Sequence, residues 1–377
     1  MTRGGSGVGV LQSVEIGVDT PRGPVDPGCF PEFDRVREAY DLPSLAASRI
    51  VAVGCGGSAG FLEDMARAGV GEFVLIDPDT VDLPNVGTQQ VYGRDLGVPK
   101  VEAIARRLVA VSPHVRVWTL RAPLDRSLND QAMRRLCQSP LPGSGYWVPA
   151  TTLLCAFTDD FWAQARVSRL GLQFGLPVLG ATVYREGRGI ELTFSAPGVT
   201  PACIRCALGS RYRAYLDQGF KNDVGSRGTP IWATARLNSL KQPVALALLQ
   251  KTSRLRDTSH PSFERTERFL SAVREKNLVM VGLDPDICET LQLSTFCLIA
   301  ASTLADDLAF DTALWRRQTP DTPDNGWPYC PDCGGTGDLS DSIGRLSNTA
   351  DLPCVLDQAR TPSKPTLKSR ANSKETR

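Results

Sequence analysis

One stretch of this chain, residues 50–77, constrains the fold more than any other. An apolar segment over residues 50–53 leads into a turn with three glycines, Gly54, Gly56 and Gly57. A helix-forming segment follows, and a second apolar segment, 73–76, ends at Asp77, about twenty residues after the first glycine. Glycines let the backbone approach a phosphate, and the N-terminus of a helix adds N–H donors. Because an acid after the second strand can accept a ribose hydroxyl, these residues predict a Rossmann-type nucleotide-binding unit.

Polar residues after Asp77 narrow the class of ligand. Asn85 and Gln89 lie in a polar loop, and Lys100 opens the next expected helix. A lysine in the first turn of a helix opposes the helix dipole, and this cost favours a functional role for Lys100. A dehydrogenase needs no such set, whereas nucleotidyl transfer needs amides and an ammonium group around moving charge. The set therefore favours a triphosphate-binding protein, with a nicotinamide-dependent oxidoreductase as the alternative from another class.

The order of these motifs resembles the ThiF/MoeB-type adenylyltransferases, in the superfamily that includes the ubiquitin-activating enzymes. The pattern there is strand, Gly-x-Gly-Gly, helix, Ala-Gly-Val-Gly, strand, Asp-x-Asp, a loop with Asn, Arg and Gln, and Gly-x-x-Lys. Residues 68–71 supply the Ala-Gly-Val-Gly element, and the resemblance covers about 49–210 and returns near Cys330. It implies an α/β fold: a Rossmann-like, mostly parallel sheet with helices on both faces and a zinc-stapled C-terminal part.

The resemblance also implies how the chain would bind ATP and Mg²⁺. The three turn glycines match the phosphate-facing turn, and Asp77 matches the ribose-binding acid. The loop amides of the family fall on Asn85 and Gln89, while Lys100 matches the lysine that contacts the ATP phosphates. Asp159 matches the acid that binds the metal. Of these residues, Lys100, Asp159 and Gln89 are expected to be catalytic.

Asp159 also has a physical reason of its own to bind a metal. It follows a predicted parallel strand over 152–156, so it lies at the carboxyl edge of the sheet, where open α/β sheets bind ligands. A carboxylate there can hold the Mg²⁺ that bridges triphosphate oxygens. The alternative is a helix N-cap, although Asp160 fits that position better because the predicted helix starts directly after it.

Two departures from the family pattern weaken the expectation of catalysis. The family usually has an arginine directly before the loop glutamine, and Thr88 stands there. A threonine cannot hold phosphate charge with the two parallel hydrogen bonds of an arginine, and Arg94 is the nearest substitute in sequence. Many homodimeric members also use an N-terminal arginine across the dimer, for which Arg35 and Arg37 are only candidates. A catalytically weak or inactive partner subunit is therefore the main alternative.

Two Cys-x-x-Cys pairs predict a structural zinc site. Their four thiolates, from Cys203, Cys206, Cys330 and Cys333, would complete a tetrahedral Zn²⁺ shell. Such pairs favour metal over disulfides in a cytosolic protein, and the family places its two pairs in the same order. The alternative is four reduced, unpaired cysteines.

A thioester or persulfide step would need a further cysteine. In sulfur-carrier activators this residue often lies in the crossover loop after the first cysteine pair, but residues 218–230 contain none. Cys288 and Cys297 stand in apolar segments and are expected to be core residues. The sequence therefore supports adenylation better than thiol transfer.

The composition sets limits on partners and location. The chain has 377 residues, of which 42% are hydrophobic and 22% charged, as in ordinary globular proteins. A net charge of +1 predicts no general attraction to nucleic acid or to anionic membranes. Without a run of about 18 apolar residues or a signal peptide, the protein is expected to be cytoplasmic. We expect an N-terminal arm with a short helix over 1–48, an adenylation domain over 49–340 with an insertion at about 207–329, and a disordered polar tail over 341–377.

Apolar periodicity predicts the remaining elements. The expected strands are 49–53, 73–76, 115–118, 152–156, 177–179, 190–194 and 278–281. The expected helices are 31–40, 61–68, a segment after Lys100, 161–175, 231–250 and 289–310.

Together with the resemblance, these residues imply an enzyme that activates a carboxylate with ATP. The carboxylate attacks the α-phosphorus, which gives an acyl-adenylate and pyrophosphate. A carboxylate is already ionised at pH 7, so no general base is required. By resemblance, the substrate is a small ubiquitin-like or sulfur-carrier protein that ends in Gly-Gly, and the enzyme is a homodimer.

Overall fold

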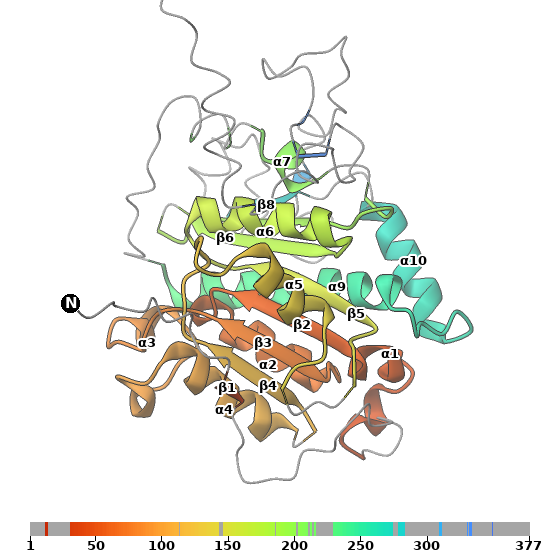
Figure 1. Cartoon of the computed structure of the whole chain (residues 1–377), viewed down its shortest axis with the longest axis horizontal. Helices are drawn as coiled ribbons and strands as arrows, with labels where there is room; N and C mark the ends of the chain where they lie inside the picture. The colour runs from red at the N-terminus through yellow and green to blue at the C-terminus, as the bar shows by residue number, and fades with distance from the viewer. Residues whose placement is uncertain are drawn as a thin grey trace, which may run out of the picture.

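The computed structural model describes the part of the chain that carries the predicted nucleotide-binding unit. The described residues are 12–13, 31–112, 114–142, 146–184, 186–200, 203–209, 212, 215, 229–273, 278–282, 309–310, 330, 332–333 and 349. Within them, a nine-stranded sheet runs through the centre, and helices lie on both of its faces (Figure 1).

The sheet has the strand order β1-β4-β3-β2-β5-β6-β7-β8-β9. Its strands are β1 (Gln12–Ser13), β2 (Ser48–Val53), β3 (Glu72–Ile76), β4 (Arg116–Leu120), β5 (Thr151–Ala156), β6 (Val178–Tyr184), β7 (Gly189–Ser195), β8 (Leu278–Gly282) and β9 (Ala309–Phe310). The five central strands, from β4 to β6, pair in parallel, and the strands outside them pair antiparallel. The parallel centre confirms the predicted α/β fold, and the antiparallel flanks make the complete sheet mixed.

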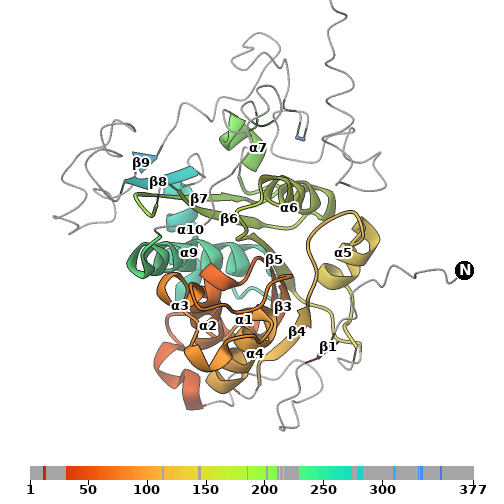
Figure 2. The ribbon, with the colours of Figure 1, turned by 90° about the vertical axis from the view of Figure 1, so that its left-hand side faces the viewer.

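Helices cover both faces of the sheet (Figure 2). On one face lie α2 (Ala59–Arg67), α4 (Lys100–Val111) and α9 (Ile231–Thr252), and on the other lie α5 (Asp130–Gln138) and α6 (Phe161–Phe174). The other described helical segments are η2 (Pro31–Val36), α1 (Leu42–Ala46), η3 (Gly56–Ser58), α3 (Asn85–Thr88), η4 (Gly93–Asp95), α7 (Ile204–Ala207) and α10 (Pro261–Val273).

Strand β2 illustrates why the central strands read as continuous apolar runs. Ile50 and Ala52 contribute to the core beneath α2, α4 and α9, whereas Val51 and Val53 contribute to the core beneath α5 and α6. These four side chains are at most 4% exposed. Burial of a Val or Ile side chain stabilises a fold by about 1.5–3 kcal/mol, so both faces of the strand hold the sheet in place.

Some of the predicted elements agree with the structure only in part. The helix predicted over 31–40 is a 3₁₀ helix over Pro31–Val36. Of the helix predicted over 289–310, residues 289–308 lie outside the described residues, and the last two form β9. The region 207–329 contributes α9, α10, β8 and β9. Within the predicted tail, Thr349 is buried and its N–H donates to Asp130 at 2.8 Å.

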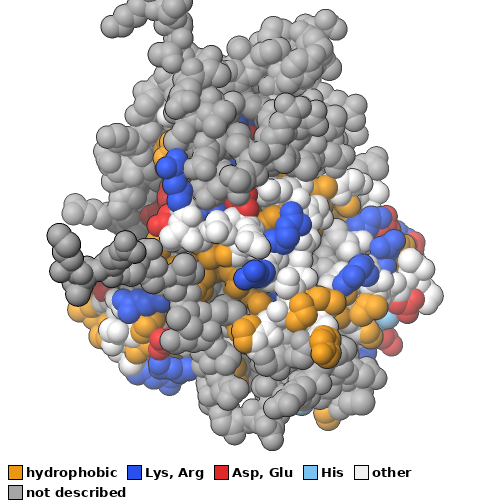
Figure 3. All heavy atoms as spheres, in the orientation of Figure 1, with side chains coloured by type: hydrophobic (Ala, Val, Ile, Leu, Met, Phe, Trp, Pro, Cys, Tyr) orange, Lys and Arg blue, Asp and Glu red, His pale blue; other side chains and the backbone are white. Residues whose placement is uncertain are grey.

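The face of the molecule seen in Figure 3 is mixed in character where its residues are described. Basic, acidic and apolar side chains are interspersed over the face seen in Figure 3. This distribution agrees with the net charge of +1 for the whole chain. Among the described helices, none has the length and apolar character that crossing a membrane requires.

Candidate active site and metal centre

A cavity of about 460 Å³ lies at the carboxyl ends of β2, β3 and β5. The strand order reverses here, since β3 lies on one side of β2 and β5 on the other. Open α/β sheets bind their ligands at such points. The cavity brings together seven of the eight residues that were expected to bind nucleotide: Gly54, Gly56, Gly57, Asp77, Gln89, Lys100 and Asp159.

The glycine turn crosses other parts of the chain at very short range. Gly54 has a φ of +81°, and a Cβ atom there would lie 2.7 Å from the backbone carbonyl of Phe157. A Cβ atom on Gly56 would lie 2.2 Å from Gln89 Oε1, so the Gln89 amide lies directly over the turn. That oxygen is buried and has no hydrogen-bond partner among the described residues. The close approach of Phe157 and Gln89 leaves no room for a side chain at Gly54 or Gly56.

Asp77 fixes the turn to the end of β3. Its carboxylate accepts hydrogen bonds from the Cys55 N–H at 2.7 Å and from the Asp79 N–H at 3.0 Å. Burial raises the pKa of Asp77, while these two hydrogen bonds oppose the shift. Because each carboxylate oxygen has two lone pairs, Asp77 can still accept a ribose hydroxyl from a ligand in the cavity.

Lys100 begins α4 and reaches the same cavity. Its backbone N–H donates to the Asp79 carbonyl, and its Nζ donates to the Asp79 carboxylate, both at 2.9 Å. The Lys100 side chain is 9% exposed, whereas the Asp79 side chain is 61% exposed. The lysine is therefore held in place at the cavity wall by a carboxylate that faces solvent.

The two aspartates after β5 have different positions. Asp160 is the N-cap of α6, where its side chain accepts a hydrogen bond from the Trp162 N–H at 2.9 Å. Asp159 lines the same cavity as Thr158 and the glycine turn. The capping role predicted for Asp160 is confirmed, and both aspartates belong to the lining of the cavity.

Only some side chains of the polar loop between β3 and α4 line the cavity. Asn85 does not line the cavity, and its side chain accepts a hydrogen bond from the Asp82 N–H at 3.1 Å. Thr88 lines the cavity at the place of the family's arginine. Arg94 lies over the Tyr92 ring at 4.9 Å and is not in the cavity lining. Arg37 is paired with Asp34 at 2.7 Å.

Three residues of α9 contact the glycine turn or the loop of Thr88 and were missed by the sequence reasoning; two of them, Thr234 and Lys241, line the cavity. Thr234 donates to the Thr88 carbonyl at 3.0 Å, and Asn238 donates to the Gly57 carbonyl at 3.0 Å. Lys241 Nζ donates to Ser58 Oγ at 2.8 Å. The spacing of Thr234, Asn238 and Lys241 places them on one face of the helix, and this polar stripe was the available signal.

Lys241 is almost completely enclosed. It is 2% exposed and yet lines the cavity, with its ammonium group 4.1 Å from the centre of the Phe157 ring. Burial lowers the pKa of Lys241 to about 7, and the negative charge that Cys155 would carry as a thiolate acts in the opposite direction. A buried ammonium group in a ligand-sized cavity is characteristic of functional sites.

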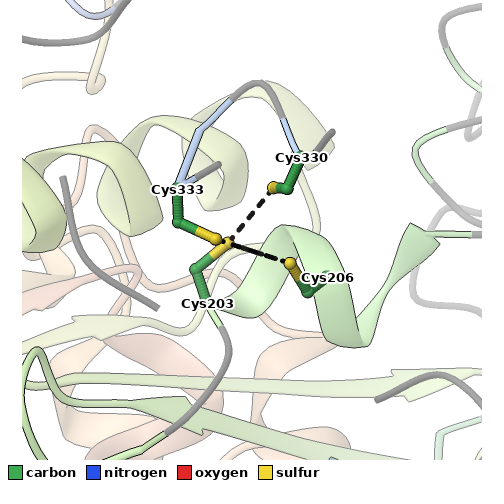
Figure 4. A group of neighbouring side chains, drawn as sticks. All are labelled: Cys203, Cys206, Cys330 and Cys333. Atoms are coloured by element: carbon green, nitrogen blue, oxygen red, sulfur yellow. Dashed lines mark hydrogen bonds between the residues drawn. The ribbon is translucent and has the colours of Figure 1, made fainter. Parts of the chain in front are cut away.

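The four predicted zinc ligands come together at α7, which contains Cys206 and has Cys203 as its N-cap (Figure 4). The Sγ of Cys203 lies 3.8 Å from that of Cys206 and 3.6 Å from that of Cys330, and Cys206 and Cys333 are 3.5 Å apart. A Zn²⁺ ion with bonds of about 2.3 Å to four thiolates requires sulfur atoms about 3.8 Å apart. The four thiols are buried, and their separations fit a tetrahedral zinc ion.

An ion pair joins the two cysteine pairs. Arg205, inside the first pair, donates to Asp332, inside the second, at 2.8 Å, and Arg169 lies 3.4 Å from the same carboxylate. All three side chains are at most 1% exposed. The contact brings together segments 127 residues apart in sequence, and so it supports the geometry of the cysteine cluster.

The described cysteines outside the cluster are poor nucleophiles. Burial raises the pKa of the Cys55 thiol in the glycine turn, and it raises the pKa of Cys155 on β5 in the same way. Burial also raises the pKa of Cys137 to about 12. A thiol of this kind stays protonated and inert. The other two cysteines considered, Cys288 and Cys297, lie outside the described residues.

Comparison with protein families matches residues 33–309 to the ThiF family. The match covers most of the chain, and this chain therefore belongs to the ThiF family, as the motifs indicated. The glycine turn, the polar loop, α6 and α9 all lie inside the matched region.

Three curated relatives illustrate the range of the family. The SAMP-activating enzyme E1 of Haloferax volcanii is 30% identical over 165 residues, which cover 43% of this chain and 54% of that protein. The ubiquitin-like modifier-activating enzyme 5 of Culex quinquefasciatus is 26% identical over 182 residues, 48% of this chain and 42% of the relative. The molybdopterin-synthase adenylyltransferase of Haemophilus influenzae is 39% identical over 153 residues, which cover 40% of this chain and 57% of that protein. The chain thus spans about half the length of the curated relatives it matches.

Proposed function

We propose that this chain is an adenylyltransferase that uses MgATP to activate the C-terminal carboxylate of a small ubiquitin-like or sulfur-carrier protein. One observation carries the proposal: the cavity at the strand-order reversal contains the glycine turn, Lys100 and Asp159 together. The names of the relatives, which are activating enzymes and adenylyltransferases, support the same reaction class.

Each residue would have a separate role in binding the nucleotide. The glycine turn would approach the phosphates, and Asp77 would accept a ribose hydroxyl. Lys100 and Gln89 would contact the phosphate chain, while Asp159 would anchor Mg²⁺, which offsets the charge of the triphosphate when bound. Asn85 also stays a predicted ligand by resemblance, although a change of rotamer would be needed to free its side chain from Asp82.

The reaction itself needs little from the protein besides positioning. One oxygen of the partner's carboxylate forms a bond to the α-phosphorus, and the bond from that phosphorus to the β-phosphate oxygen breaks. Pyrophosphate leaves with the electron pair, and no proton is transferred. Catalysis then rests on alignment of the two reactants and on fixed positive charge around the phosphates.

Other parts of the proposal concern assembly. We propose that Zn²⁺ is held by the four clustered cysteines and stabilises the C-terminal part of the fold. We also propose a homodimer in the cytoplasm, a partner that ends in Gly-Gly, and an adenylation domain over residues 49–340 between an N-terminal arm and a polar tail.

Exchange of labelled pyrophosphate into ATP tests the proposed activity. The wild-type chain should catalyse exchange only with Mg²⁺ and a cognate small protein that ends in Gly-Gly, because exchange requires a reversible acyl-adenylate. The matched control is the same small protein without its two terminal glycines. Exchange that is independent of the partner, or hydride transfer to a nicotinamide, would contradict the proposal.

Thr88 favours a second function, that of a non-catalytic subunit in an activating complex. Without the loop arginine, the chain could bind ATP and still lack the charge needed for rapid transfer. Such a subunit would bind ATP alone and support exchange only after a second ThiF-family chain is added, which the same assay can detect.

A further inference from the structure

The cavity has an uneven charge balance. Its described lining includes five acidic side chains, Asp77, Asp79, Asp159, Asp160 and Glu186, but only two basic ones, Lys100 and Lys241. Lys100 is already paired with Asp79. A bound triphosphate would add further negative charge, so the second lysine becomes important for any nucleotide in this cavity.

Lys241 is held so that it faces the glycine turn. Its Nζ donates to Ser58 Oγ and to Asn238 Oδ1, both at 2.8 Å. Ser58 is the N-cap residue of α2, yet its side chain makes no capping hydrogen bond. The hydroxyl instead accepts from Lys241, which fixes the ammonium group beside the turn.

The packing around Lys241 gives no structural reason for a positively charged side chain at this position. None of the ion pairs among the described residues involves Lys241. The other neighbours of its ammonium group are the Phe157 and Phe61 rings, at 4.1 Å and 5.6 Å from their centres. A buried ammonium group without a carboxylate is costly, and a polar or apolar residue of similar size would serve packing at less cost.

The same helix face also supports the loop that lacks an arginine. Thr234 binds the Thr88 carbonyl, and Asn238 binds the Gly57 carbonyl and Gln90 Oε1 at 3.0 and 3.1 Å. One turn further along α9, Lys241 adds a positive charge to this group of contacts. The stripe therefore connects the loop of Thr88, the glycine turn and a cation that faces the cavity.

We propose that Lys241 binds the phosphate chain of the nucleotide and supplies the positive charge that Thr88 cannot provide. This inference rests on the proposed function, since it takes ATP as the ligand of the cavity. It assigns the phosphate-binding role to a residue about 150 positions after the loop, brought to the site by the packing of α9.

Binding of ATP and of adenosine to purified full-length variants tests this inference. Lys241→Met should weaken ATP binding about ten- to a hundredfold, the effect of losing one hydrogen bond from a charged donor. Adenosine binding should not change, because adenosine has no phosphate. Lys251→Met is the matched control, since Lys251 lies on the same helix and is paired with Glu267 at 2.7 Å.

The possible results separate this inference from the proposed function. If wild type binds ATP and Lys241→Met binds it equally well, the inference is wrong and the proposed function stands. Equal weakening of ATP and adenosine would show a structural role, which also overturns the inference. If wild type binds no ATP at all, the proposed function fails and the inference fails with it.

Discussion

Lys100 Nζ lies 2.9 Å from the carboxylate of Asp79, the second acid of the Asp77-Pro78-Asp79 segment after β3. The lysine is buried at the cavity wall and the acid faces solvent. A phosphate in the cavity can therefore replace the Asp79 carboxylate as the partner of Lys100. The exchange costs little, because the exposed carboxylate returns to water. The pair keeps the ammonium group at the site before a nucleotide arrives.

Lys100→Ala should slow pyrophosphate exchange by raising its activation free energy by about 2–4 kcal/mol, the usual effect of losing one oriented donor from a charge-stabilising site. Thr88→Ala is a suitable control, because Thr88 lines the same cavity and has no positive charge to lose. Steady-state exchange rates for both variants measure the difference. Equal rates in Lys100→Ala and wild type would remove Lys100 from the site.

Replacement of Cys203 and Cys206 by serine should release about one metal ion per chain and lower the free energy of unfolding by several kcal/mol. The reason is that two thiolate ligands cannot hold Zn²⁺ in a closed tetrahedral site. Cys137→Ser is the control, since Cys137 is buried on α5 and outside the cluster. Elemental analysis and thermal melting measure both effects, and wild-type protein that is metal-free and melts normally would refute the site.

Glu72→Gln should destabilise the fold by about 3–5 kcal/mol, because it leaves two buried arginines without a counter-charge. Arg49 Nε is paired with the Glu72 carboxylate. Arg116 Nε lies 3.8 Å from the same carboxylate, and its guanidinium group lies over the Trp147 ring. Urea unfolding measures the loss. Glu264→Gln breaks a largely exposed pair with Arg268 and should change stability little; an equal effect of both substitutions would contradict the argument.

Lys241→Met should change how stability depends on pH. Burial lowers the pKa of Lys241 to about 7 from an ordinary value of 10.5, so the unfolded chain binds this proton more tightly. The folded chain therefore carries a cost that is full below about pH 7 and disappears as the pH approaches 10.5. Cys155 stays neutral over most of this range because burial raises its own pKa.

The expected result is that the stability of Lys241→Met relative to wild type is highest at pH 7 and falls steadily towards pH 10. Urea unfolding at three pH values measures this difference. Loss of the hydrogen bonds to Ser58 and Asn238 adds an offset that does not depend on pH over this range. A relative stability that is constant from pH 7 to pH 10 would contradict a lowered pKa.

Local motifs allowed much of the site to be predicted. The glycine turn, Asp77, Lys100 and Asp159 each stand at the end of a strand or the start of a helix, and parallel strands bring their carboxyl ends to one edge. Packing on both faces makes the central strands apolar throughout, which is why β2, β3 and β5 could be located. The paired cysteine spacing likewise predicted a cluster that the structure brings together.

Other features depend on contacts that a local pattern cannot reveal. Lys241 meets Ser58 across 183 residues, and its polar stripe on α9 looks like an ordinary solvated face until the helix is packed on α2. Asn85 was expected by resemblance to bind the nucleotide; in the structure its side chain accepts from the Asp82 N–H and does not line the cavity, and its role stays a prediction. The antiparallel direction of β7 and β8 is set by their partners in the sheet and not by their composition.

The most direct test of the account compares pyrophosphate exchange by Asp159→Ala and Asp160→Ala, with Mg²⁺ and a cognate small protein present. Asp160→Ala should lower stability by about 1 kcal/mol, the usual cost of a lost N-cap, and keep exchange. Asp159→Ala should stay folded and lose Mg²⁺-dependent exchange, because Mg²⁺ beside the triphosphate would lose its protein ligand. Wild-type exchange that persists undiminished in Asp159→Ala would contradict the assignment of this cavity as the site of adenylyl transfer.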